Sequence, residues 1–143
     1  MPTYHTGDIY LLEGSSQSLA IGGLTQALVF INGSNDSFYD NFSTDVTVVM
    51  HGHNDSIFQY GGNPTLTIMG FNASDSLSLY GLLPNPNGTG SEPPGTPITA
   101  ANLHPDGHGG WTLPLGSTSG VDFEFTKEST ILAAHITVSE RSF

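Results

Sequence analysis

The chain of 143 residues has no cysteine and only two basic residues, Lys127 and Arg141, against thirteen acidic ones. The absence of cysteine excludes a disulfide framework and metal sites built on thiolates. The formal net charge of −11 argues against binding to nucleic acids or to anionic membrane surfaces, because both depend on clustered Lys and Arg. An excess of carboxylates instead attracts cations or keeps a protein soluble.

Long apolar runs are also lacking. No stretch approaches the roughly 18 apolar residues of a membrane span, so we expect no membrane insertion. The opening "MPTYHTGDIY" has neither a basic start nor an apolar run, and no N-terminal signal peptide is visible. No long helical periodicity appears, whereas 18 Gly and 9 Pro favour strands and turns. The sequence therefore predicts a single all-β domain.

What the sequence does contain is a repeat with a spacing of nineteen residues. The phrase "NGSNDSFY" at 32–39 returns as "HGHNDSIF" at 51–58. Short apolar runs precede the copies: "IYLL", "LVFI", "TVVM" and "LTIM". With one insertion before the last copy, four columns align: Gly14, Gly33 and Gly52; Gln17, Asp36, Asp55 and Asp75; Ser18, Ser37, Ser56 and Ser76; Leu19, Phe38, Ile57 and Leu77.

Each copy supplies two short strands and two turns, which is too little to bury its own apolar side chains. Neighbouring copies must therefore stack. We predict a parallel β-solenoid of about four 19-residue rungs over residues 1–81. The alternative is an antiparallel β-sandwich with hairpins of equal length, although a sandwich does not need the same residue type in every turn.

Residues 82–143 break the period. A Pro/Gly-rich loop at 84–97 is followed by strand-like segments at 110–115, 120–125 and 134–138. An uncovered solenoid end exposes unpaired backbone and apolar side chains. We therefore interpret 82–143 as a C-terminal capping segment of the same domain.

The segments "GSNDSFY", "GHNDSIF" and "ASDSLSL" resemble the calcium-binding repeats-in-toxin family, the β-roll proteins exported by bacterial type I secretion. The closing "DGHGGWTLPLGSTSGVDFEF" and "ILAAHITV" are similar to the module that follows such repeats. The resemblance implies a β-roll, calcium as a cofactor, and a location outside the cell or at its surface. The chain departs from the family's glycine-rich nonapeptide, because Ile31, Asn32 and Ser34 stand where its three glycines would precede Asp36.

The repeated aspartates are the candidate metal site. In stacked rungs they would form a ladder with a spacing of about 4.8 Å. Carboxylates at that distance repel by roughly 1 kcal/mol in water, and a cation between them would remove the repulsion. Calcium prefers such oxygen ligands, which here would be Asp36, Asp55 and Asp75 with Asn35 and Asn54. The alternative is that these residues occur because their side chains bond the backbone of tight turns.

No pattern in the sequence separates a catalytic acid from a nucleophile, and no serine lies in a G-x-S-x-G elbow, so we expect no enzymatic activity. Tyr39 and Phe58 should face outward by strand alternation, as an exposed aromatic stripe. We expect an exported structural protein of the cell surface or matrix that self-associates through open strand edges as a homo-oligomer or polymer. Two alternatives are a calcium-binding secretion or folding module and a carbohydrate-binding or carbohydrate-acting solenoid with a polysaccharide partner.

Overall fold

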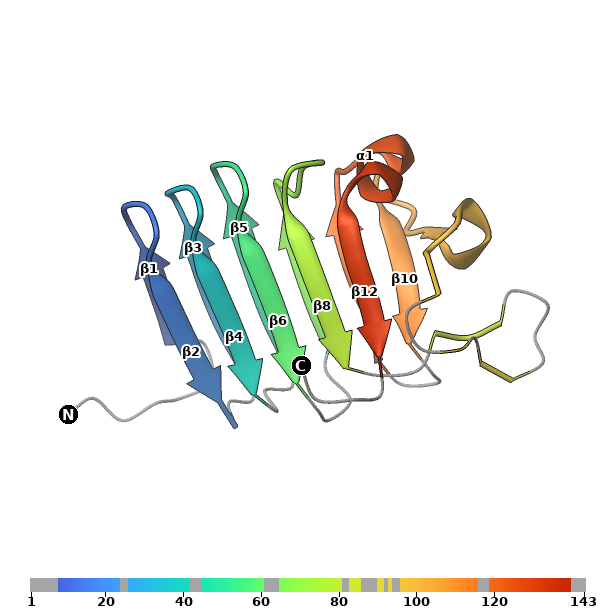
Figure 1. Ribbon diagram of the computed structural model, residues 1–143, viewed down its shortest axis with the longest axis horizontal. Coiled ribbons are helices and arrows are strands. Elements are labelled where there is room, and N and C mark those ends of the chain that lie inside the picture. The colour runs from blue at the N-terminus through green and yellow to red at the C-terminus, as the bar shows by residue number, and fades with distance from the viewer. Residues whose placement is uncertain are drawn as a thin grey trace.

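The computed structural model describes residues 8–23, 26–41, 45–60, 65–80, 83–85, 90–91, 93, 96–115 and 119–139. Most of them form two sheets that face each other (Figure 1). The first sheet has the strand order β1 (Asp8–Leu12), β3 (Gln26–Ile31), β5 (Asp45–Met50), β7 (Thr65–Met69), β11 (Ser119–Glu124), β10 (Trp111–Leu115) and β9 (His104–Pro105). The second has the order β12 (His135–Ser139), β8 (Ser76–Tyr80), β6 (Ser56–Tyr60), β4 (Ser37–Asn41) and β2 (Ser18–Gly22).

The chain crosses between the two sheets after every strand from β1 to β8, so each consecutive strand pair is one rung. Strands of neighbouring rungs are parallel and in register at the predicted spacing, with Ser18 opposite Ser37 and Ser37 opposite Ser56. Asp45 lies opposite Thr65 and Ser56 opposite Ser76, so the one-residue insertion precedes the fourth rung. The predicted parallel β-solenoid is confirmed: about three turns of the coil lead from the first rung, β1 and β2, to the fourth, β7 and β8. The parallel pairing excludes the antiparallel sandwich.

The core lies between the sheets and follows from alternation along each strand. In β3, β5 and β8 every second side chain is buried, as expected for strands with one face on a core. The predicted apolar column is part of this core, since Phe38, Ile57 and Leu77 have no exposed surface. Burial of each such side chain stabilises the fold by about 1.5–3 kcal/mol.

The repeated glycines allow the turns to stack closely. A Cβ atom on Gly33 would lie 1.5 Å from the carbonyl oxygen of Gly14, and one on Gly52 would lie 1.9 Å from that of Gly33. No side chain fits at these distances. Asn35 and Asn54 have φ angles of 60° and 57°, in the left-handed region that Asn tolerates better than most residues. The recurring Gly and Asn thus have distinct backbone roles.

The three strands predicted after residue 82 are present as β10, β11 and β12. Of these, β11 continues the first sheet parallel to β7, and β12 continues the second sheet parallel to β8. The proposed cap therefore adds a fifth rung. The antiparallel strands β10 and β9 extend the first sheet beyond it.

Two short helices interrupt this terminal part: η1 (Ala100–Asn102) and α1 (Glu128–Ala133), neither of which we predicted. Helix α1 connects β11 to β12 and lies at the same end of the strands as the turns with the repeated aspartates (Figure 1). Across the described residues, no helix has the length and apolar character needed to cross a membrane.

Candidate functional site

The three repeated aspartates stack in one column, and all of them are buried: Asp36 is 1% exposed, and Asp55 and Asp75 are 0% exposed. Each accepts a hydrogen bond from the backbone of the preceding rung. The Oδ1 atoms of Asp36, Asp55 and Asp75 accept the N–H groups of Gln17 (2.8 Å), Asp36 (2.9 Å) and Asp55 (3.0 Å), respectively. Each carboxylate therefore joins two successive turns.

The Oδ2 atoms of these three aspartates have fewer hydrogen-bond partners than the Oδ1 atoms. Oδ2 of Asp75 accepts the N–H of Asn72 at 2.9 Å. Oδ2 of Asp36 and of Asp55 is buried and has no hydrogen-bond partner among the described residues. Burial raises the pKa of Asp55 and of Asp75, and backbone hydrogen bonds oppose this. For Asp55 the carboxylates of Asp75 and Asp36 raise the pKa further. The folded state therefore disfavours the charged form of these groups.

The predicted asparagine ligands lie beside the ladder but are exposed. The backbone N–H of Asn35 donates to the carbonyl of His53 at 3.0 Å, and that of Asn54 donates to Oγ of Ser74 at 3.1 Å. The structure thus brings all five predicted ligands to one end of the rungs. Their contacts with the backbone give them a structural role, and calcium binding by Asp36, Asp55, Asp75, Asn35 and Asn54 stays a prediction.

A second acidic cluster was missed in the sequence. One carboxylate oxygen each of Asp106, Asp122 and Glu124 lie within 4.8 Å of one another, and these groups could hold a metal ion. Asp122 and Glu124 alternate with buried residues on β11. Asp106 follows β9, and its Oδ1 accepts the N–H groups of His108 (2.7 Å) and Gly110 (3.0 Å).

Two carboxyl groups of this cluster have pKa values that are shifted in opposite directions. Desolvation, together with the carboxyl groups of Asp106 and Glu124, raises the pKa of Asp122 to about 7. In contrast, the backbone N–H of His108 is the main reason that the pKa of Asp106 is lowered. Asp122 therefore holds a proton over much of the acidic range. A bound cation would compete with that proton.

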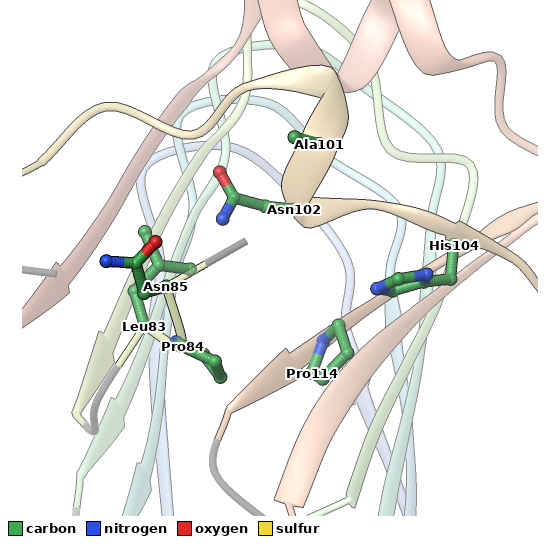
Figure 2. Close-up of a pocket in the computed structure, with 7 residues that line it drawn as sticks. All are labelled: Leu83, Pro84, Asn85, Ala101, Asn102, His104 and Pro114. Atoms are coloured by element: carbon green, nitrogen blue, oxygen red, sulfur yellow. The ribbon is translucent and has the colours of Figure 1, made fainter. Parts of the chain in front are cut away.

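One cavity in the terminal part is too small for most ligands. A cavity of about 120 Å³ lies between the segment after β8 and the segment from η1 to β10. Figure 2 shows Leu83, Pro84 and Asn85 on one side of it and His104 and Pro114 on the other. Ligand pockets usually measure about 300–1,000 Å³. His104 is the one titratable side chain in the lining, so the cavity does not pair an acid with a base.

The first rung has open edges. No strand in the described part of the chain pairs with the outer edge of β1 or β2. The carbonyl of Leu12 accepts the N–H of Asn32 in the second rung, and that of Gln17 accepts the N–H of Ser37. Because bonding directions alternate along a strand, the N–H and C=O groups of Ile9 and Leu11, and of Ser18 and Ala20, point to the open side.

The predicted aromatic stripe is present on the outside of the second sheet. Tyr39 and Phe58 alternate with buried residues, and their rings are stacked with centroids 4.8 Å apart and planes 9° apart. Both side chains are half-buried.

Comparisons with known proteins do not assign this chain to a family. No family model matches this chain, and neither a curated protein nor a solved structure is significantly similar to it. The coil geometry is consistent with a β-roll type of solenoid.

Proposed function

We propose that this protein is a non-enzymatic structural β-solenoid that self-associates through the open edge of its first rung. The observation that carries the proposal is that β1 and β2 are both unpaired on their outer sides within the described chain. Because the two strands belong to one rung, a second copy can extend both sheets at once. Unpaired N–H and C=O groups on a strand edge are a template for another strand.

Exposed apolar side chains accompany these backbone groups. Large hydrophobic residues are exposed at four described positions, and two of them are on β1: Ile9 is 66% exposed and Leu11 is 55% exposed. Complete burial of such a side chain is worth about 1.5–3 kcal/mol. A contact along β1 would thus combine backbone hydrogen bonds with apolar burial.

The two ends of the solenoid are not equivalent. At the far end, the first sheet extends through β10 and β9, whereas the second sheet ends at β12. In a head-to-tail contact, β1 of one copy would pair with β9 of the next and β2 with β12, and these two end strands are not at the same position along the solenoid axis. In addition, β9 has only two residues. When the first rungs of two copies pair, β1 meets β1 and β2 meets β2, so no such offset arises. We therefore favour a closed, two-fold dimer with antiparallel pairing over an open polymer.

Sedimentation velocity over a wide range of concentration tests this proposal. The wild-type protein should convert from monomer to dimer as concentration rises. Leu11→Lys should remain monomeric, because a lysine on an edge strand opposes pairing. Ile9→Pro should act similarly, because it removes an N–H group that points to the open side, and proline is tolerated on edge strands.

The matched control is Leu132→Lys. Leu132 is 37% exposed on α1, away from the first rung, and its replacement makes the same change in charge. This variant should dimerise like the wild type. A wild-type protein that stays monomeric at every concentration would overturn the proposal, as would equal dimerisation by Leu11→Lys and Leu132→Lys.

The place of action follows from the resemblance alone. We propose that the protein is exported and acts at the cell surface or in a matrix, as the similarity to type I exported repeats-in-toxin proteins implies. The coil geometry, which is consistent with a β-roll type of solenoid, agrees with this resemblance. Fractionation of the native organism's cells, with antibody detection, should find the protein in the external or surface fraction.

Calcium binding is a second candidate, favoured by Asp106, Asp122 and Glu124. Three carboxylates within 4.8 Å form an oxygen-only donor set, which suits calcium. Calorimetric titration with calcium chloride should show binding that Asp122→Asn weakens if this cluster is the site. Weakening by Asp55→Asn instead would indicate the aspartate ladder. The absence of calcium-dependent heat in the wild type would rule out this second function.

A further inference from the structure

The outer face of the second sheet carries no carboxylate, ammonium or guanidinium group in its described side chains. Its outward positions are Ser18, Ala20, Gly22, Ser37, Tyr39, Asn41, Ser56, Phe58, Ser76, Ser78, Tyr80, His135 and Thr137. This is unexpected for a chain with thirteen acidic residues. The outer face of the first sheet, in contrast, carries Asp45, Asp122 and Glu124. Charge is therefore segregated between the two faces.

The residues of this uncharged face form regular rows across the strands. One row consists of Ser18, Ser37, Ser56 and Ser76. Within it, the Oγ atoms of Ser56 and Ser76 lie 2.9 Å apart and are hydrogen-bonded. The hydroxyl groups repeat at the strand spacing of about 4.8 Å. Each hydroxyl can both donate and accept a hydrogen bond.

The central row adds an aromatic platform. It runs through Ala20, Tyr39, Phe58, Ser78 and Thr137, so small side chains flank the stacked pair of rings on both sides. Phe58 lies between Tyr39 and Ser78 in this row. The side chain of Ser78 is too short to cover a phenyl ring. An apolar surface thus lies directly beside the row of serine hydroxyls.

We propose that this face binds an uncharged polysaccharide laid across the strands along the row of Tyr39 and Phe58. Sugar rings present C–H groups on their faces, which pack on aromatic rings, and hydroxyl groups on their rims, which pair with serine hydroxyls. An anionic polymer would find no basic partner here and would be repelled by the net charge of −11. A polymer of repeating units can also make the same contacts on successive rungs.

The proposal uses a different surface from self-association. The sugar-binding rows lie on the outward side of β4, β6 and β8, whereas dimerisation uses the backbone edge of β1 and β2. Monomeric Leu11→Lys should therefore still bind polysaccharide. The two proposals can fail separately.

Affinity electrophoresis provides the test, with native gels that contain hydroxyethylcellulose, amylose or laminarin, and a gel with polygalacturonate as the charged comparison. We expect wild-type mobility to fall with at least one neutral polymer and to be unchanged with polygalacturonate. Phe58→Ala should lose about tenfold in affinity, the value of one aromatic contact. Phe30→Ala, an outward aromatic position on the first sheet, is the matched control and should bind like the wild type.

A second pair of variants keeps the test independent of any loss of folding in Phe58→Ala. Ser78→Glu places a charge in the central row, and Thr47→Glu places one in an outward position on β5 of the first sheet. Ser78→Glu should abolish retardation and Thr47→Glu should not. The proposal is wrong if no neutral polymer retards the wild type, if polygalacturonate retards it as strongly, or if both glutamate variants bind equally.

Discussion

Replacement of Gly52 by alanine tests whether the close stacking of turns holds the solenoid together. The new Cβ atom would lie 1.9 Å from the carbonyl oxygen of Gly33, and that oxygen belongs to a hydrogen-bonded turn with little freedom to move. An ordinary contact of 3.4 Å requires the two turns to separate by 1.5 Å at this point. The substitution therefore acts on the interface between the second and third rungs.

The cost follows from the hydrogen bonds that cross this interface. Three of them lie close to Gly52: they run from the N–H of Asn35 to the carbonyl of His53 (3.0 Å), from that of Asp36 to Oδ1 of Asp55 (2.9 Å), and from that of His53 to Oγ of Ser34 (3.1 Å). A separation of 1.5 Å would break all three. Each contributes about 1 kcal/mol, and a buried donor left unpaired costs more. Since alanine also stiffens the unfolded chain by about 0.4–1 kcal/mol, we expect a net destabilisation of about 2–4 kcal/mol.

Urea unfolding followed by circular dichroism measures this change. The single tryptophan, Trp111, lies on β10 and is remote from the turn, so the β-sheet signal is the better probe. Gly22→Ala is the control, because its Cβ atom would lie 3.3 Å from the carbonyl oxygen of Asn41 and its φ is ordinary. This control should stay within about 1 kcal/mol of the wild type. Equal unfolding midpoints for the two alanine variants would refute the stacking argument.

Three further predictions concern the carboxylates. Burial raises the pKa of Asp55 and of Asp75 above 3.8, so the stability that their protonated forms contribute is complete below that value and is lost as pH rises through the folded pKa values. The free energy of unfolding of Asp55→Asn should therefore increase relative to the wild type as pH rises through this window, and a constant difference in urea titrations would contradict the pKa shift. Carboxyl NMR should give Asp122 a titration midpoint near 7, whereas a midpoint near 4 would show that the cluster does not form. Asp106→Asn should lower that midpoint, because it removes a neighbouring carboxylate, and an unchanged midpoint would show that the two groups do not interact.

The regular part of the fold was predictable because every rung has the same pattern of strands and turns. The spacing of nineteen residues and the columns of Gly, Asp and Ser gave the register in which Ser18, Ser37 and Ser56 align. The buried state of the aspartates was not predicted, because their N–H partners come from a neighbouring rung. Strand β4 also departs from simple alternation of apolar and polar types, since the inward Asp40 is 0% exposed.

The terminal part was less predictable because its geometry depends on distant pairing. A long inserted segment separates β8 from β11, so the fifth rung does not continue the period in the sequence. The cluster of Asp106, Asp122 and Glu124 forms only when the antiparallel pairing of β9, β10 and β11 is known. The alternating Asp and Glu in "GVDFEF" was the one local signal of an outward acidic pair.

Amide hydrogen exchange measured by NMR at low and high protein concentration tests the proposed self-association most directly. The N–H groups of Ile9, Leu11 and Ala20 point to the open side of the first rung, whereas those of Tyr10 and Leu19 point to the second rung. If two first rungs pair, the former three should gain protection as concentration rises, and the latter two should be protected at both concentrations. Exchange at Ile9, Leu11 and Ala20 that is equally fast at both concentrations would contradict association through this edge.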